Sequence, residues 1–319
     1  MKKFFCLFLI LTLMTVPCLT LADLHGRHDS AEAKAYIGRT DLTGLFTRKN
    51  EDYPFELVLP DWVRKSLTEM EIYEEIYKKV GIDLEEEVRL RRLSVKDGKY
   101  YINFKEKKIE KEVIRVLYKY GFSIKEISII DALRIGGLNL LGFDIKDSRE
   151  LHYFINIKIV ELEENINIED YSFLACFPNL KILGMENNNI SDLTFLAYVN
   201  INIDTISLKN NKISDISILS KFHNLRVLYL SNNQIISLMG LENLKKLEKL
   251  YIDGNPITLD GLRYIEQLCF SEVLWKLHID RKAFGEYGKH FALYPEYFQW
   301  VDRIYFYEDD GRVTEWRNE

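Results

Sequence analysis

LKNNKISDISIL, residues 208–219, carries an asparagine pair followed by isoleucines at uneven intervals. These intervals match neither the helical period of about 3.6 residues nor the strand period of about 2. The same spacing recurs around it, with asparagines at Asn188, Asn211, Asn233 and Asn255 that are 23, 22 and 22 residues apart. Self-similarity at a fixed period of this length predicts a solenoid of stacked repeats.

Each repeat has a physical interpretation. Its two closely spaced leucines alternate as in a strand and both point into the core. The chain then turns, and a buried asparagine amide can satisfy turn backbone groups that would otherwise lack partners. An isoleucine then re-enters the core, although Asn167 stands at that position in one repeat. The pattern predicts a structural asparagine ladder: Asn165, Asn188, Asn211, Asn233 and Asn255.

The phrases NNISDLTFL and NKISDISIL are similar to the leucine-rich repeat family, in the 22-residue form of bacterial internalins. The resemblance covers roughly residues 133–280, and residues 281–319 would form a degenerate repeat or cap. It implies an α/β fold, a curved parallel sheet with an irregular or helical convex side, which LDGLRYIEQL makes more helical near the end of the repeats. It also implies a bacterial, non-enzymatic protein that binds other proteins.

The N-terminus, MKKFFCLFLILTLMTVPCLTLADLHG, has two lysines before an apolar run and small residues suited to cleavage after Ala22. This pattern predicts a signal peptide over residues 1–22. An uncleaved membrane anchor is the alternative, but the run is short for a span of about 20 residues. We therefore expect a secreted, periplasmic or cell-surface protein with no membrane insertion after cleavage.

The net charge of the chain argues against two classes of partner. Removing Lys2 and Lys3 with the signal changes the formal net charge from −6 to −8, which argues against nucleic acid and anionic membranes as partners.

Two cysteines, Cys176 and Cys269, remain after cleavage. They lie about four coils, or roughly 20 Å, apart, whereas a disulfide needs Cα atoms within roughly 7 Å. We expect two separate thiols.

The search for catalytic motifs finds no H-E-x-x-H, no C-x-x-C, no glycine-rich phosphate loop and no G-x-S-x-G elbow, so we expect no cofactor. One metal hypothesis concerns the mature N-terminus. The amine of Asp23, two backbone amides and the His25 imidazole would form a square-planar nitrogen set, which Cu(II) and Ni(II) favour. The simpler alternative is a solvated terminus without metal.

Between the signal and the repeats, residues 23–51 read as a poorly ordered lead-in and residues 52–132 as an α/β cap domain. The pattern predicts a helix capped by Ser66 and Glu69, a hairpin at Asp97-Gly98, and a second helix in EKEVIRVLYKYGF. Ser123 and Glu126 would cap a third helix. Such a domain would cover the first coil of the repeats; the alternative is an independent binding or catalytic domain.

The residue between the two close leucines should point out of the concave face. In chain order this position holds Asn139, Glu161, Gly184, Ser207, Tyr229, Tyr251, His278 and Tyr305, and the neighbouring lane ends with Lys249, Lys276 and Arg303 beside Trp275. Tyrosine, tryptophan and arginine often dominate interface energy. We therefore predict that a protein partner, from a host or envelope surface, docks around Tyr229 and Tyr251. Alternatively, the rings only stack on each other along the strands.

Two other functions stay open at this point. One is an exported enzyme whose active site lies in residues 52–130 and which uses the repeats to select its substrate. The other is a structural envelope component without a specific partner.

Overall fold

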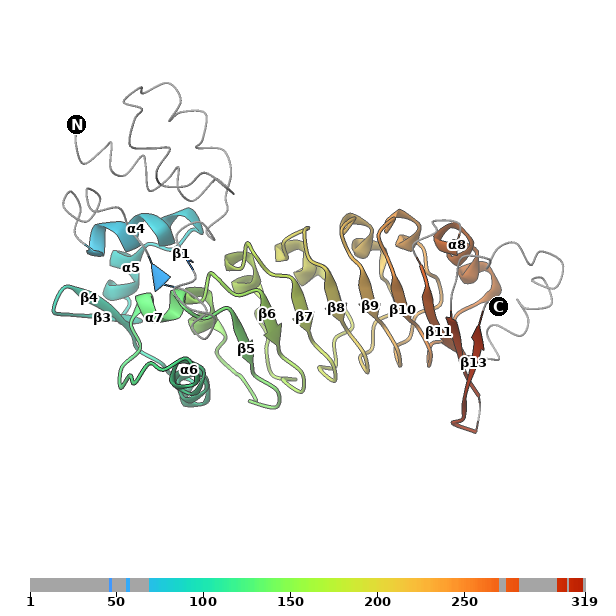
Figure 1. Cartoon of the computed structure of the whole chain (residues 1–319), viewed down its shortest axis with the longest axis horizontal. Helices are drawn as coiled ribbons and strands as arrows, with labels where there is room; N and C mark the ends of the chain where they lie inside the picture. Colours follow the sequence, from blue (N-terminus) through green and yellow to red (C-terminus); the bar gives the residue numbers. More distant parts are fainter. Residues whose placement is uncertain are drawn as a thin grey trace, which may run out of the picture. The chain divides into compact units, whose positions relative to one another are not determined.

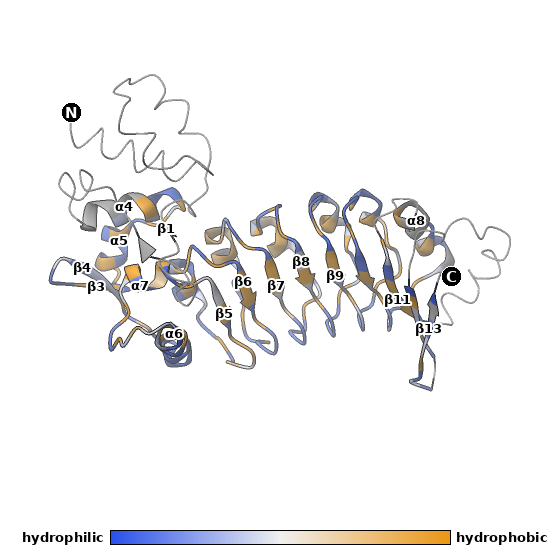
Figure 2. Cartoon of the chain, viewed as in Figure 1, coloured by the Kyte–Doolittle hydropathy of each residue, from blue (hydrophilic) through white to orange (hydrophobic). Residues whose placement is uncertain are grey.

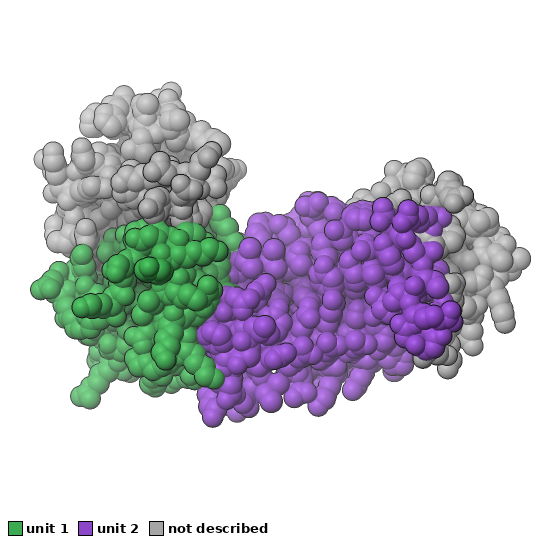
Figure 3. Space-filling model, turned by 60° about the horizontal axis from the view of Figure 1, so that its bottom comes forward, with its two compact units in different colours: residues 1–138, 147–158, 173–179 green, residues 139–146, 159–172, 180–319 purple. Residues whose placement is uncertain are grey.

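The computed structural model of the protein describes residues 46–47, 56–57, 69–269, 274–280, 303–308 and 310–317. The predicted signal peptide, the candidate metal ligands Asp23 and His25, and the proposed cap residue Ser66 lie outside these residues. The chain divides into two compact units (Figure 3). Unit 1 comprises residues 1–138, 147–158 and 173–179, and unit 2 comprises residues 139–146, 159–172 and 180–319.

Unit 1 combines helices with short antiparallel strands. Strands β1 (Phe46–Thr47) and β2 (Glu56–Leu57) pair with each other. The remaining elements before the repeats are α4 (Glu69–Lys79), α5 (Leu84–Arg89), β3 (Leu93–Lys96), β4 (Lys99–Ile102), α6 (Lys107–Lys119) and α7 (Ile129–Leu133).

Two local predictions for unit 1 are confirmed. Strands β3 and β4 form the hairpin around Asp97 and Gly98, whose φ angles of 49° and 68° suit a tight two-residue turn. Helix α6 is the amphipathic helix predicted in this region, and it buries Ile109, Val113 and Leu117 completely.

The predicted cap of the third helix is wrong. Helix α7 begins after Ser128, whose Oγ accepts a hydrogen bond from the Asp131 amide at 3.3 Å. In return, the Ser128 amide donates to Asp131 Oδ2 at 3.0 Å. Ser123 and Glu126 have the same spacing, but the short helix that follows Ser128 is almost entirely buried, so packing decided which capping box formed.

A nine-stranded sheet runs through the repeats, in the order β5 to β13 (Figure 1). Its strands are β5 (Gly137–Asn139), β6 (Ile159–Glu161), β7 (Ile182–Gly184), β8 (Thr205–Ser207), β9 (Val227–Tyr229), β10 (Lys249–Tyr251), β11 (Lys276–Asp280), β12 (Arg303–Tyr307) and β13 (Val313–Arg317). From β6 to β12 they pair in parallel, which confirms the predicted solenoid. Strand β13, which the sequence pattern did not predict, pairs antiparallel with β12.

Short helical turns connect the strands. They are the 3-10 turns η3 (Arg149–Tyr153), η4 (Ser172–Cys176), η5 (Thr194–Tyr198), η6 (Ser217–Lys221) and η7 (Leu241–Asn243), and the helix α8 (Leu259–Cys269). Helix α8 confirms the predicted helical return. An aspartate stabilises the start of three of these turns, because its Oδ1 accepts a hydrogen bond from the backbone amide two residues later. The three residues are Asp170, Asp192 and Asp215.

The core of unit 2 includes the paired apolar residues of each repeat, which recur along the strands (Figure 2). The following members of these pairs have completely buried side chains: Leu183, Met185, Ile206, Leu208, Leu228, Leu230, Leu250 and Ile252. One residue that enters the core differs from the predicted one. The repeat pattern placed Asn167 at this position, but Ile168 is buried instead. The side-chain amide of Asn167 donates to the Asp144 carboxylate at the exposed surface. The apolar residue is preferred in the core because a buried amide needs partners.

Asn211 shows how the asparagines join successive repeats. Its Oδ1 accepts the amides of Asn188 and Ile190, both at 3.0 Å. Its Nδ2 donates to the carbonyls of Met185, Leu208 and Lys209 at 2.9–3.1 Å. The other four ladder asparagines also form hydrogen bonds with the preceding repeat. Each of them bonds in addition to its own turn or to the next ladder asparagine: Asn165, Asn188, Asn233 and Asn255.

The residue before each ladder asparagine has a left-handed backbone. Its φ lies between 54° and 71° at Glu164, Asn187, Asn210, Asn232 and Gly254. Asparagine and glycine tolerate this region better than other residues. The asparagine pair that opens the repeat pattern therefore has two roles: the first residue makes the turn, and the second bonds it to the neighbouring repeat.

Among the described residues, Cys176 is a free, partly buried thiol. Burial raises its pKa to about 11, so the thiol stays protonated at neutral pH. The side chain of Cys269 lies outside the described part of the chain, so the separation of the two thiols stays a prediction.

Candidate functional site

The outward positions of the last four parallel strands hold a continuous stack of four rings. Strand register places Tyr229, Tyr251, His278 and Tyr305 side by side. Successive ring centroids are 4.3, 4.1 and 4.4 Å apart, with interplanar angles of 25°, 27° and 14°. Neighbouring strands lie about 4.8 Å apart, a distance at which flat rings in register can stack. We call these four residues the aromatic ladder.

Stacking determines what the aromatic ladder offers to a partner. The rings cover one another's faces, so their edges and polar tips are the parts available to solvent. Burial raises the pKa of the Tyr229 and Tyr251 hydroxyls, with further contributions from neighbouring groups. Both hydroxyls are therefore protonated at neutral pH and can donate as well as accept hydrogen bonds.

Lysine side chains lie over the rings. Lys209 Nζ is 4.6 Å from the Tyr229 centroid and 5.7 Å from that of Tyr251. Lys276 Nζ is 5.5 Å from the Tyr251 centroid and 4.8 Å from that of Tyr305. Such cation–π contacts contribute about 0.5–1 kcal/mol each at exposed sites. They also hold two positive charges over the ring of Tyr251.

The other predicted residues of this face lie at its border. Lys249 Nζ is 4.8 Å from the ring centroid of Trp275, whose side chain is exposed. Arg303, at the start of β12, forms an ion pair with Glu315 of β13 at 3.8 Å. The structure therefore brings the predicted tyrosines, histidine and lysines into one surface, but Arg303 is partly neutralised by a strand that the sequence pattern missed.

His278 is the most buried member of the aromatic ladder, with only 8% of its surface exposed. Its Nδ1 lies 3.0 Å from Tyr307 Oη, and its buried Nε2 has no hydrogen-bond partner among the described residues. Burial, followed by the charges of Lys276 and Lys209, lowers its pKa to about 4, so the ring is neutral at pH 7. Tyr307 was missed, although strand alternation from Tyr305 would place it on the same face.

Carboxylates occupy the other half of the sheet's outward face. Glu161 accepts a hydrogen bond from Asn139 Nδ2, and Glu186 Oε1 accepts one from Ser207 Oγ at 2.6 Å. Glu163 lies over Gly184, where a Cβ would clash with its carboxylate. Burial raises the pKa of Glu163, and the nearby carboxylates raise it further. We call Glu161, Glu163 and Glu186 the acidic patch.

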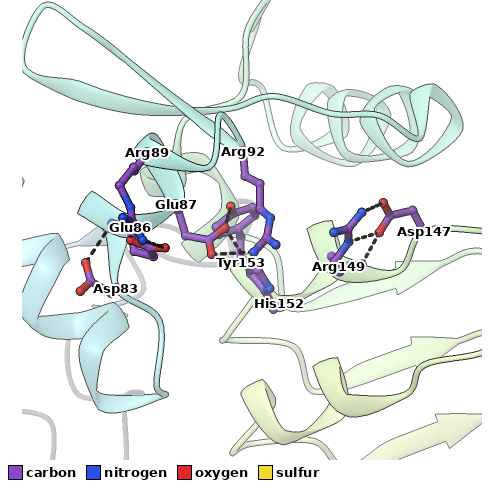
Figure 4. A network of polar contacts seen from close by, with 9 residues as sticks. All are labelled: Asp83, Glu86, Glu87, Arg89, Arg92, Asp147, Arg149, His152 and Tyr153. Atoms are coloured by element: carbon purple, nitrogen blue, oxygen red, sulfur yellow. Dashed lines mark hydrogen bonds and ion pairs between the residues drawn. The ribbon is translucent and has the colours of Figure 1, made fainter.

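Unit 1 contains a separate polar network around Glu87 (Figure 4). Tyr153 Oη donates to Glu87 Oε2 at 2.6 Å, and Arg92 Nη1 donates to Glu87 Oε1 at 2.9 Å. His152 Nε2 lies 3.6 Å from the same carboxylate. Burial acts to raise the pKa of Glu87, but these neighbours together lower it to about 2. A carboxylate that is ionised and surrounded by donors is suited to holding segments together and is a weak general base.

Tyr77 adds a second connection within unit 1. Its hydroxyl donates to the backbone carbonyls of Tyr153 at 2.8 Å and Ile129 at 3.1 Å. Together with Glu87, it ties α4 and α5 to residues 147–158. The sequence did not indicate the partners of Tyr77 and Glu87, because nothing in the local pattern points to a residue 66 or 76 positions away.

Across the described ranges, no three metal-binding side chains lie close enough together to hold an ion. The helices in this part of the chain are all too short or too polar to cross a bilayer.

Comparison with known families gives a match over the central repeats. The family model described as "Leucine Rich repeats (2 copies)" matches residues 201–239 and 223–264. Residues 201–264 are therefore leucine-rich repeats. These segments contain strands β8 to β10 and the asparagines that connect them, so the match and the geometry concern the same residues. Leucine-rich repeats are scaffolds for protein–protein interaction.

Several solved structures are similar to this chain. An internalin, inlF, of Listeria monocytogenes is 22% identical, with 54% of this chain and 50% of that chain covered and a TM-score of 0.46. Internalin C2 of the same organism is 24% identical, with coverages of 53% and 81% and a TM-score of 0.43. A leucine-rich repeat protein of Leptospira interrogans is 25% identical, with coverages of 46% and 38% and a TM-score of 0.38. The matched part thus spans half the length of the inlF chain. The sequence has no significant match among curated proteins.

Proposed function

We propose that this leucine-rich repeat protein is an exported, non-enzymatic binding protein. It recognises a host or envelope surface protein with the C-terminal half of its concave face, centred on Tyr229 and Tyr251. The aromatic ladder is the observation that carries this proposal. The signal-like sequence of residues 1–22 supports export.

Preorganisation supports the choice of this surface. Immobilising a flexible side chain on binding costs about 0.5–1.5 kcal/mol, and that cost is smaller for a ring that is already stacked. The ladder also combines rigid aromatic area with hydroxyl groups, a combination common in residues that dominate binding energy. Trp275, exposed beside Lys249, extends the same surface.

The test begins with a partner captured by the wild-type protein, identified and purified. Its affinity is then measured for the Tyr229→Ala/Tyr251→Ala double variant. We expect binding to weaken by at least about 2 kcal/mol, or roughly 30-fold, because two anchor rings are lost. Circular dichroism and thermal melting establish that the variant is folded.

Tyr118→Ala/Tyr198→Ala is the matched control. These tyrosines are 74% and 51% exposed and lie on α6 and η5, away from the sheet strands. The control should bind like the wild type. Wild-type affinity in a folded Tyr229→Ala/Tyr251→Ala variant would place the binding surface elsewhere.

The Glu87 network is the one described feature that favours an enzyme in residues 52–130, because a buried carboxylate lies beside a histidine. A general base with a pKa near 2 would be poorly matched to neutral pH, which favours the binding proposal. A reaction that is abolished by Glu87→Gln in a folded protein would support the enzyme instead. If the protein stays bound to the cell envelope and captures no partner, this result would support the alternative of a structural envelope component.

A further inference from the structure

Charges are segregated along the outward face of the sheet in unit 2. The acidic patch belongs to β6, β7 and the residues that directly follow them. Four cations lie on or directly after strands β8 to β12: Lys209, Lys249, Lys276 and Arg303. The face therefore has a negative half and a positive half, although the chain as a whole carries a formal net charge of −6.

The positive half also contains acidic residues, but these have donors. Asp253, only 8% exposed, accepts the Ser231 hydroxyl at 2.8 Å. Asp280 accepts the Gly254 amide at 2.7 Å, and Glu315 pairs with Arg317 at 2.9 Å. Each of these carboxylates therefore has a hydrogen-bond donor or an ion-pair partner within the protein.

The two lysines over the aromatic ladder differ in this respect. Within the residues that the structure describes, Lys209 and Lys276 form no ion pair, and their side chains contact rings instead. Both ammonium groups lie over the ring of Tyr251, so their positive charges repel each other there. A group that only accepts hydrogen bonds and carries negative charge would relieve this repulsion.

The shape of the surface narrows the class of ligand. The rings stack on one another, so the ladder offers edges and hydroxyls, and a sugar ring would find few open aromatic faces to stack on. A carboxylate can accept from a lysine and a tyrosine hydroxyl at once. The acidic patch, two to four strands away, requires the opposite charge from the same partner.

We infer that the partner places an acidic segment over the aromatic ladder, with carboxylates between Lys209 and Lys276, and a basic group over the acidic patch. The partner therefore docks in one direction along the sheet. This inference rests on the proposed function, because it assumes that the outward face binds protein. The net negative charge of the chain would repel an acidic segment, so the lysines must supply the local attraction.

The test uses the full mature protein with a fluorescent oligoglutamate peptide as probe, followed by anisotropy at low and at physiological ionic strength. We expect oligoglutamate to bind at low salt and more weakly at physiological salt, because the contacts are exposed to solvent. Lys209→Gln/Lys276→Gln should weaken binding by about fivefold to tenfold. Lys212→Gln/Lys245→Gln is the matched control, with the same charge change at exposed positions outside the strands, and should bind normally.

A second probe tests the direction of docking. Oligolysine should bind the wild type and lose affinity by about fivefold in Glu163→Gln/Glu186→Gln, whereas oligoglutamate should not. Equal affinity of oligoglutamate for both lysine double variants would overturn the inference. So would preferential binding of a sulfated oligosaccharide or single-stranded DNA at the same lysines.

The purified partner separates this inference from the proposed function. Loss of partner binding in Tyr229→Ala/Tyr251→Ala, with full binding in Lys209→Gln/Lys276→Gln, would leave the binding face intact and refute the acidic segment. Full binding in both double variants would refute the proposed function as well. Loss in both, with normal binding by the lysine and tyrosine controls, is the result we expect.

Discussion

Units 1 and 2 are stabilised in different ways. In unit 2 the same contact recurs in five successive repeats, as with Asn211, whose side-chain amide donates to carbonyls of its own turn and of the preceding repeat. In unit 1 the decisive contacts each occur once, such as the hydrogen bond between Tyr153 and Glu87. The difference shows that periodic structure can be inferred from spacing, whereas a single long-range contact leaves no repeated signal.

The same difference has an energetic consequence. The stability of a repeat array is approximately the sum of the stabilities of the single repeats and of the interfaces between neighbouring repeats. In unit 1, by contrast, removing one partner of a buried charged pair leaves the other groups without compensation. The following substitutions test this contrast.

Asn211→Ala should have the largest effect. It removes the acceptor of two backbone amides and the donor to three carbonyls, most of them buried, and we expect a loss of about 3 kcal/mol in the free energy of unfolding. Urea unfolding measures it. Asn210→Gly is the control, because glycine accepts the left-handed backbone of this exposed neighbour. Equal stability of Asn211→Ala and wild type would remove Asn211 from the ladder.

Tyr153→Phe should cost about 2 kcal/mol, because a buried hydrogen bond to an ionised carboxylate is lost. A double-mutant cycle with Glu87→Gln tests whether the two residues act together. We expect a coupling energy of about 1 kcal/mol or more. Tyr118→Phe, at an exposed tyrosine, should have no effect. Strictly additive effects of Tyr153→Phe and Glu87→Gln would show that the network is not cooperative.

Acidification should weaken the two units in different pH ranges. The pKa of His278 falls from its ordinary value of 6.5 to about 4 in the fold, so the unfolded chain binds its proton more readily. Its contribution to stability is therefore complete above pH 6.5 and is lost as the pH falls towards 4. Glu87 has a pKa of about 2 instead of 4.5, so its contribution is present above 4.5 and is lost as the pH falls towards 2.

His278→Gln provides the measurement for this comparison. Between pH 7 and pH 4.5 the wild type should lose about 2 kcal/mol more unfolding free energy than His278→Gln, because the variant cannot take up that proton. Urea midpoints at the two pH values determine the difference. An identical pH dependence in the two proteins would show that His278 is already protonated, or solvated, in the native state.

Glu164→Asn should have the smallest effect and should stabilise the protein. Glu164 has a φ of 58°, and it is the one residue before a ladder asparagine that is neither asparagine nor glycine. Asparagine tolerates this backbone better, so we expect a gain of about 0.5–1 kcal/mol. Glu164→Gln controls for the lost charge, and Glu169→Asn controls for the same exchange at an exposed site without positive φ. A gain that Glu164→Gln reproduces would be due to charge and not to conformation.

Only part of the aromatic ladder can be predicted from the sequence. The spacing of the repeats placed Tyr229 and Tyr251 on one face, because strand side chains alternate. It could not show that Lys209 and Lys276 lie over those rings, because lysine direction depends on what surrounds the side chain. Nor did it reveal that Glu315 neutralises part of Arg303, because β13 lacks the repeat pattern.

By itself, the sequence determined the solenoid, the register of strands β6 to β10 and the positions of the asparagine ladder, because a nearly constant period imposes the same local geometry on each of these repeats. The tertiary structure alone decided that Ser128 and not Ser123 caps α7, that Ile168 and not Asn167 enters the core, and that Glu87 meets Tyr153. In each of these cases several residues satisfy the local pattern equally well. Burial of apolar surface and the pairing of buried polar groups then select one arrangement, and both depend on segments distant in the chain.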